Sequence, residues 1–134
     1  MTTAPIVNSL DKERLEPHIS PTLSQSWPIL QLRRLMDQAK VVLPRRVPPN
    51  VVTMNSRVRF RDLHWDDSEA VTLVYPDADD ATGKSAVSVT SPLGAALLGA
   101  RIGDEARWIG PRGPRRVLVE ALEYQPEQAG RYDL

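Results

Sequence analysis

Residues 90–105 read TSPLGAALLGARIGDE, an apolar stretch between a Ser-Pro pair and a Gly-Asp pair. The stretch is too short to cross a bilayer as a helix, which needs about 20 apolar residues. Ser91 suits the N-cap of a short helix near residues 93–98, and Pro92 suits its first turn. Gly99 can end this helix, and the leucines within it can cover the apolar face of a sheet. The stretch therefore predicts one short helix set between strands.

Residue alternation on both sides of this segment predicts β-strands. Residues 51–63 place Arg57, Arg59 and Arg61 on one face and apolar side chains on the other. Further strands are expected at residues 71–75, 86–90, 108–109 and 115–124. The acidic, glycine-bearing stretch between the strands expected at residues 71–75 and 86–90 is typical of a turn. We expect a meander of antiparallel strands around one short helix, and so an α+β fold.

Prolines divide the N-terminal part of the chain, since seven of the twelve lie within residues 1–49. A first short helix is expected over residues 10–16, capped by Asn8 or Ser9. A second helix begins at Pro28 and carries an apolar heptad stripe. The stripe consists of Ile29, Leu32, Met36, Ala39 and Leu43. It can pack on the rest of the domain or pair with the first helix in an antiparallel hairpin.

Composition excludes several classes of protein. The 134 residues include 17 basic and 17 acidic side chains and no cysteine. The zero net charge gives no overall attraction to nucleic acid or to an anionic membrane. Without cysteine there is neither a disulfide-stapled scaffold nor a thiolate zinc site. Residues 1–10 lack the basic start and apolar run of a signal peptide, so we expect a cytoplasmic protein.

Side chains suited to catalysis or metal binding are sparse. The two histidines, His18 and His64, are far apart in sequence, and His64 lies in an LHWDD segment typical of a loop. The segment ATGKS lacks the upstream glycine of a phosphate-binding loop. We expect no catalytic residue, no metal and no cofactor, and therefore a binding protein rather than an enzyme.

The arginine stripe is a candidate contact surface. Arg57, Arg59 and Arg61 could meet phosphates or a protein partner. They could equally be solvated or paired with acidic neighbours. The candidate acids are Asp62, Glu120 and Glu123. No aromatic side chains interleave with the stripe, as base stacking would require, so direct nucleic-acid contact is not expected to be its primary role.

Four segments, taken in order, are typical of a known family. They read VVTMNSRVRFRDL at residues 51–63, LVYP at 73–76, SPLGAALLGARIGD at 91–104 and LEYQPEQAG at 122–130. Together they resemble Rnk, the family of regulators of nucleoside diphosphate kinase, which is related to the transcript-cleavage factors GreA and GreB. The resemblance is strong from residue 51 onward and weak before it.

The resemblance implies a fold, a partner and a contact site. A short N-terminal antiparallel helical hairpin, or coiled coil, is expected over residues 1–46. An FKBP-like antiparallel sheet domain with one short helix is expected over residues 47–134. The family binds RNA polymerase at the entrance of its secondary channel, with the C-terminal domain docked outside, and we expect a monomer that does the same. By position, the docking element falls on Ser91, Pro92, Leu93 and Gly94.

Two features depart from the Gre pattern. Thr90 stands where Gre factors often carry an aspartate, so one charged docking contact is absent or replaced. The connection between the two helices, HISPTLSQSW at residues 18–27, contains no Asp or Glu. Gre factors hold a catalytic Mg²⁺ with acidic residues at this tip, and Mg²⁺ requires oxygen ligands at about 2.1 Å. We therefore expect occupation of the Gre site, in competition with Gre factors, without stimulation of transcript cleavage.

Two other functions remain open. The family name indicates a direct regulator of another enzyme, such as nucleoside diphosphate kinase. An FKBP-like domain would also be compatible with a peptidyl-prolyl isomerase, although a fold does not by itself imply an activity. The aromatic-lined pocket of an isomerase would draw on one Phe, three Trp and three Tyr in the entire chain.

Overall fold

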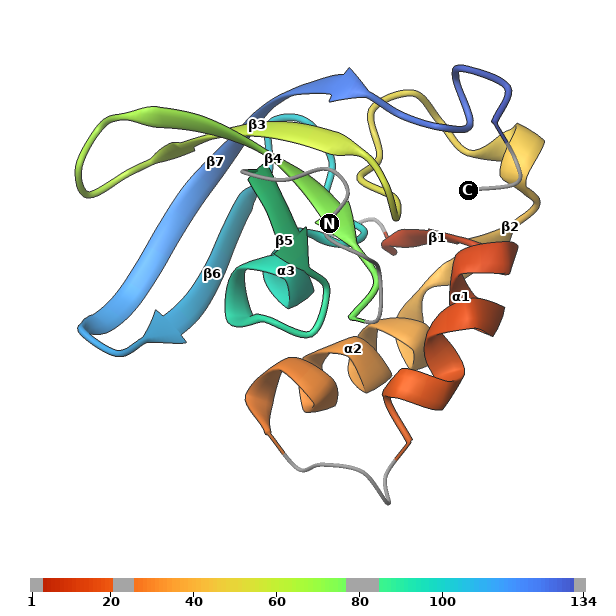
Figure 1. The fold of residues 1–134 in the computed structure, drawn as a ribbon, viewed down its shortest axis with the longest axis horizontal. Helices are drawn as coiled ribbons and strands as arrows, with labels where there is room; N and C mark the ends of the chain where they lie inside the picture. The colour runs from red at the N-terminus through yellow and green to blue at the C-terminus, as the bar shows by residue number, and fades with distance from the viewer. Residues whose placement is uncertain (1–3, 21–25, 77–84, 132–134) are drawn as a thin grey trace.

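A five-stranded sheet in the order β5-β4-β3-β7-β6 forms the larger part of the protein (Figure 1). The computed structural model describes residues 4–20, 26–76 and 85–131. The strands are β3 (Arg57–Asp62), β4 (Ser68–Val74), β5 (Ala86–Ser88), β6 (Glu105–Gly110) and β7 (Gly113–Tyr124). The predicted first strand was too long at its start, because Asn55 adopts a φ of 64° and turns the chain before β3.

The sheet is mixed, so the expected FKBP-like antiparallel meander is wrong. β3 lies antiparallel to both β4 and β7, and β6 pairs antiparallel with β7. β5, however, pairs parallel with β4, with Thr72 opposite Ala86. A parallel pair needs a crossover rather than a tight hairpin. The turn predicted between these strands falls largely on residues 77–84, which lie outside the described residues, so only the strand pairing itself corrects the expectation.

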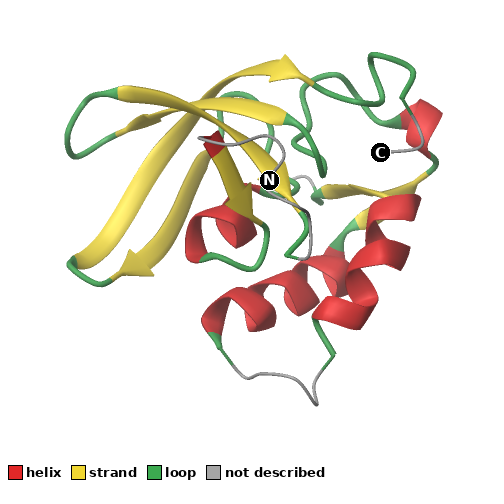
Figure 2. Ribbon diagram, in the orientation of Figure 1, coloured by secondary structure: helices red, strands yellow, loops and turns green. Residues whose placement is uncertain are grey.

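The N-terminal part contains strands that the sequence did not predict. β1 (Ile6–Asn8) and β2 (Lys40–Val42) form a small parallel sheet, and α1 (Ser9–Leu15), η1 (Glu16–His18) and α2 (Trp27–Gln38) lie between them in sequence (Figure 2). A further short 3-10 helix, η2 (Pro44–Arg46), leads toward the main sheet. The cap of the first helix is confirmed, because the Asn8 Oδ1 accepts a hydrogen bond from the Leu10 N–H.

The expected N-terminal coiled coil is wrong. α2 packs against α3 (Pro92–Leu97), and its apolar residues belong to the same core as the sheet. The buried residues of α2 are Ile29, Leu32, Leu35 and Met36. The helix also ends at Gln38, so Ala39 and Leu43 of the predicted stripe lie beyond it, and Leu43 is 50% exposed. The β-branched pair Val41-Val42 favours the strand that replaces the last predicted turn.

One hydrophobic core joins the two parts of the chain. Val7, Leu15 and Leu32 from the N-terminal part lie in the same cluster as Val58 and Val119 of the sheet. The division into residues 1–46 and 47–134 stays a prediction. Across the described part of the chain, none of the helices is long and apolar enough to cross a membrane.

Candidate partner-binding site

The junction between β5 and α3 is built by a dense set of local hydrogen bonds. The Ser91 Oγ accepts from the Gly94 N–H at 3.1 Å and donates to the Ser88 carbonyl at 2.6 Å. Ser91 is therefore the N-cap of α3, and Pro92 occupies the first turn, as predicted. Gly99, with a φ of 83°, follows the C-cap Leu98 and ends the helix, also as predicted.

Gly94 allows α3 to lie directly on β5. A Cβ atom at this position would stand 2.1 Å from the Ser88 carbonyl oxygen and 2.8 Å from the Val89 Cα. Those atoms belong to the backbone and cannot rotate away. Gly94 is buried, so it shapes the junction without offering a side chain to a partner.

The other residues of the candidate docking element differ in what they expose. Pro92 is exposed, whereas Ser91 and Leu93 are half-buried. Leu93 packs against the hydrophobic core, so only part of its side chain can reach a partner. The Thr90 hydroxyl lies 2.9 Å from the Ser88 Oγ and helps to hold the turn before Ser91. The accessible surface of this element is therefore centred on Pro92.

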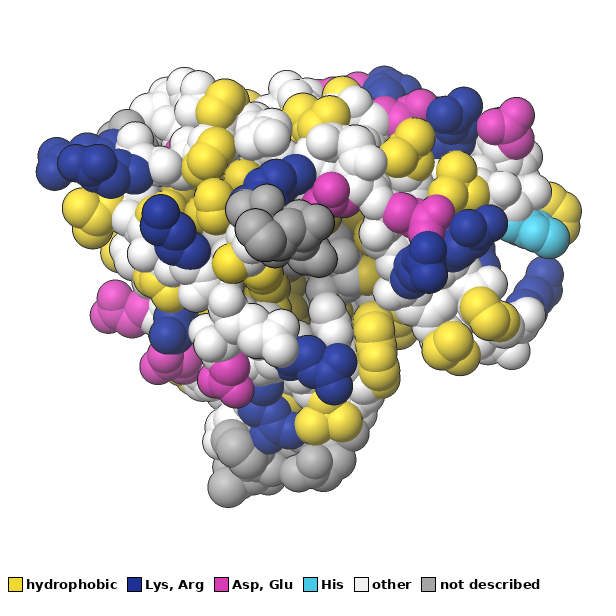
Figure 3. Space-filling view, turned by 180° about the vertical axis from the view of Figure 1, so that it is seen from behind, with side chains coloured by type: hydrophobic (Ala, Val, Ile, Leu, Met, Phe, Trp, Pro, Cys, Tyr) yellow, Lys and Arg dark blue, Asp and Glu magenta, His cyan; other side chains and the backbone are white. Residues whose placement is uncertain are grey.

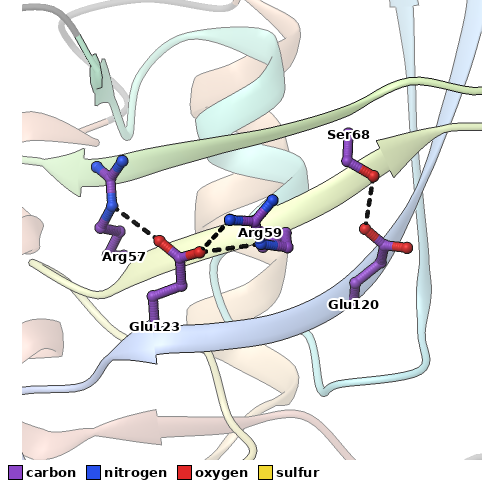
Figure 4. Close-up of polar contacts among 5 residues, drawn as sticks. All are labelled: Arg57, Arg59, Ser68, Glu120 and Glu123. Carbon is purple, nitrogen blue, oxygen red and sulfur yellow. Dashed lines mark hydrogen bonds and ion pairs between the residues drawn. The ribbon is translucent and has the colours of Figure 1, made fainter.

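The arginine stripe lies on an outward face of the sheet and is engaged by carboxylates from β7 (Figure 4). Glu123 accepts from the Arg57 Nε at 3.0 Å and from the Arg59 Nε at 2.9 Å. Hydrogen bonding from Arg59, and then from Arg57, lowers the pKa of the Glu123 carboxyl below its ordinary value. The Arg61 Nε lies 3.5 Å from a carboxylate oxygen of Glu120.

Because these carboxylates neutralise much of the charge of the arginines, the stripe is a charge-balanced surface rather than a typical phosphate-binding one. Arg57, Arg59 and Arg61 keep between 39% and 46% of their side-chain surface exposed. Any phosphate would have to compete with carboxylates that are already in place. Whether the stripe contacts a partner stays a prediction.

A buried polar cluster, which the sequence reading did not identify, connects the N-terminal part to the sheet domain. The Asn8 Nδ2 donates to the Glu127 Oε2 at 2.6 Å, and the Thr53 Oγ1 donates to the Glu127 Oε1 at 2.8 Å. The Asp11 carboxylate accepts from the Met54 N–H at 3.1 Å. We call Asn8, Asp11, Thr53 and Glu127 the Glu127 cluster; each is at most 7% exposed.

Asp11 is the member of the Glu127 cluster whose pKa is shifted. Burial raises the pKa of its carboxyl from the ordinary value of 3.8 to about 7, and the nearby Glu127 charge adds to the increase. The Met54 N–H and the Tyr75 hydroxyl, at 3.3 Å, donate to the carboxylate and oppose part of that effect. Asp11 lies in the first turn of α1, and the sequence around it does not indicate its burial, because its partners come from distant segments.

The C-terminal segment that contains Glu127 also contacts residues 48–51, which connect the N-terminal part to the sheet. The Gln125 Nε2 donates to the carbonyl oxygens of Pro48 and Val51, at 2.8 and 2.7 Å. Gln125 and Glu127 both belong to the LEYQPEQAG segment. This segment therefore binds both the chain at residues 48–51 and Asn8, the N-cap of α1. Its role in this structure is to fix the N-terminal part against the sheet.

No group of three or more potential metal ligands occurs within residues 4–20, 26–76 and 85–131. His64 lies in a turn whose backbone is fixed by Asp62. The Asp62 Oδ1 accepts from the His64 N–H at 2.8 Å and from the Trp65 N–H at 3.0 Å. The segment therefore has a structural explanation that does not involve a ligand.

Comparison with known proteins places the chain in a family. Residues 47–124 match the family described as "Transcription elongation factor, GreA/GreB, C-term". The chain is 43% identical to the "Regulator of nucleoside diphosphate kinase" of Escherichia coli strain K12, over 95% of this chain and 94% of that protein. It is 35% identical to "Transcription elongation factor GreA" of Thermodesulfovibrio yellowstonii, over 72% of this chain and 61% of that protein.

A solved structure supports the same relationship. The "Prokaryotic transcription elongation factor GreA/GreB from Nitrosomonas europaea" superimposes with a TM-score of 0.74 at 38% sequence identity, over 92% of this chain and all of that one. Sequence and fold thus agree along nearly the full length of the chain. The protein belongs to the GreA/GreB transcription elongation factor family and is related to the regulators of nucleoside diphosphate kinase.

Proposed function

We propose that the protein is a transcription regulator that binds RNA polymerase at the rim of its secondary channel. The observation that carries the proposal is the β5–α3 junction, where Ser91 and Gly94 hold an exposed Pro92 in a fixed position. A rigid, preorganised element loses little conformational entropy on binding. Membership of the GreA/GreB family supports RNA polymerase as the partner. A protein with this partner would act in the bacterial cytoplasm.

The same surface makes the protein a competitor of Gre factors. Two proteins that use one docking site on the polymerase cannot occupy it together. Cleavage stimulation is not part of the proposal, because residues 18–27 contain no Asp or Glu to hold a Mg²⁺. Backtracked elongation complexes test this point directly. We expect no cleavage product above the intrinsic rate of the polymerase, and Mg²⁺-dependent products would contradict the proposal.

A direct action on nucleoside diphosphate kinase is the second candidate function, favoured by the name of the Escherichia coli relative. A binding experiment with purified core polymerase and purified kinase distinguishes the two candidate functions. The protein is immobilised and each enzyme is passed over it at matched concentrations, with the immobilisation surface alone as control. Retention of the polymerase and not of the kinase is the expected result. Retention of the kinase alone would replace the first proposal with the second.

A further inference from the structure

A groove of about 340 Å³ opens between the start of α2 and the β6–β7 hairpin. Its apolar lining consists of Trp27, Trp108, Ile109 and Pro114. Trp27 is 40% exposed and Ile109 is 68% exposed, whereas Trp108 packs partly on the core. Single exposed apolar side chains are common, but a hollowed group of them is typical of a binding surface. Among the described residues, none fills this groove.

The groove is basic as well as apolar. Arg107, Arg115 and Arg116 line it, and Arg112 lines the adjoining hollow at the tip of the hairpin. Figure 3, the view from behind, shows that Lys and Arg side chains and hydrophobic side chains lie next to one another on that face of the molecule. All four arginines belong to the β6–β7 hairpin. Its strands pair Arg107 with Arg116 and Trp108 with Arg115.

The arginines outnumber the carboxylates that they meet. Glu105 is shared by the Arg107 Nε, at 2.5 Å, and the Arg116 Nη1, at 3.3 Å. Arg115 pairs with Asp62. The side chains of Arg107 and Arg116 still expose 72% and 55% of their surface. The groove therefore keeps a surplus of positive charge around an apolar floor.

We propose that this groove binds an acidic segment of a protein partner that inserts an apolar side chain between Trp27 and Ile109. Guanidinium groups bind carboxylates in a planar, bidentate manner, and the surplus charge is complementary to an acidic chain. The apolar wall fits a protein better than a nucleic acid. Ile109 is aliphatic and cannot stack a base, and the Arg115 guanidinium already lies over the Trp108 ring, 5.6 Å from its centroid.

The groove uses residues other than those of the Ser91–Gly94 element. α3 nevertheless packs against both α2 and β6, which form the walls of the groove. The two surfaces are thus carried by neighbouring elements of the fold. The inference goes beyond the proposed function, because it depends on groove chemistry alone and not on the identity of the polymerase.

The three tryptophans allow a direct test, since the chain has two in the groove and one elsewhere. The probe is a synthetic peptide of alternating Asp and Glu around a central Leu, titrated into ¹⁵N-labelled protein. We expect saturable shifts of the indole N–H signals of Trp27 and Trp108 that weaken as salt is added. Trp65, which is 66% exposed in the β3–β4 turn, serves as the internal control and should not move.

Two further probes and two variants make the test decisive. The same peptide with Lys in place of Asp and Glu, and an oligothymidylate, should leave Trp27 and Trp108 unshifted. Ile109→Glu should weaken binding of the acidic peptide about tenfold or more, equivalent to about 1.4 kcal/mol. Ile102→Glu, at an isoleucine that is 41% exposed outside the groove, should not. Absence of saturable shifts with the acidic peptide, or equal shifts with either control probe, would overturn the proposal.

Discussion

The Asn8 Nδ2 donates a hydrogen bond of 2.6 Å to the Glu127 Oε2, across 119 positions of sequence. Asn8 also caps α1 through its Oδ1, so one side chain begins the first helix and fastens it to the far end of the chain. Both residues are buried, and a buried hydrogen bond to a charged group is stronger than a neutral one. The position of the N-terminal helices therefore depends on the C-terminal segment.

Glu127→Ala should destabilise the protein more than a surface carboxylate change. The substitution leaves the buried donors of Asn8 and Thr53 without their acceptor, which costs about 1–3 kcal/mol. Urea unfolding of both proteins measures the difference. Glu123→Ala, at an exposed carboxylate, is the matched control and should change the free energy of unfolding little. Equal effects of the two substitutions would show that the Glu127 cluster does not stabilise the fold.

Asp11 should make stability depend on pH in the direction opposite to most carboxylates. Its pKa is about 7 in the folded protein and 3.8 ordinarily, so between these values the folded state binds more protons than the unfolded state. The contribution of Asp11 to stability is therefore complete below about pH 4 and is lost as the pH rises through about 7. Thermal unfolding from pH 5 to 8 measures this loss.

Asp11→Asn isolates the effect from other titrating groups. The variant has no ionisable group at this position, so its stability should fall less than that of the native protein between pH 5 and 8. Tyr75, Arg14 and Glu127 face Asp11 and remain unchanged in both proteins. Parallel pH profiles for the two proteins would mean that the carboxyl is not held in its protonated form.

Gly94→Ala should be severely destabilising for so small a change. The new Cβ would meet the Ser88 carbonyl oxygen at 2.1 Å, so backbone must move, and overpacking of this kind costs at least about 1–3 kcal/mol. Gly110→Ala is the matched control, because the nearest atom to its Cβ is the flexible Arg115 side chain at 3.4 Å. Similar melting temperatures for the two variants would contradict the close packing of α3 on β5.

Ser91→Ala and Pro92→Glu should separate the fold of the junction from its surface. Ser91→Ala removes the cap of α3 and should cost about 1 kcal/mol of stability. Pro92 is exposed, so Pro92→Glu should leave the melting temperature close to that of the native protein. Circular dichroism melts of both variants check this. A large loss of stability in Pro92→Glu would show that Pro92 is a packing residue rather than an accessible one.

Local signals predicted α3 well, because Ser91, Pro92 and Gly99 each act within a few residues of the helix that they begin or end. The heptad stripe of α2 was misleading for a different reason. Periodicity shows that one face of a helix is apolar, but not which surface covers it. Here α2 packs against α3, and Leu32 and Met36 belong to the core that the sheet shares, so no coiled coil forms in the described chain.

Contacts between distant segments could not be predicted from the same signals. Nothing near Asp11 in sequence indicates that the Met54 N–H and the Tyr75 hydroxyl will surround it. The parallel pairing of β4 and β5 is likewise not indicated by the composition of either strand. For the candidate docking element, position came from family resemblance, whereas the exposure of Pro92 and the burial of Gly94 came from the structure.

Competition for core RNA polymerase tests whether the protein occupies the docking site of the Gre factors. Fluorescently labelled GreB is bound to core polymerase, and the native protein and the Pro92→Glu variant are titrated in while anisotropy is recorded. We expect that the native protein displaces GreB completely and that Pro92→Glu, although equally stable, requires a higher concentration. GreB that stays bound in the presence of a large excess of the native protein would contradict binding at the shared site.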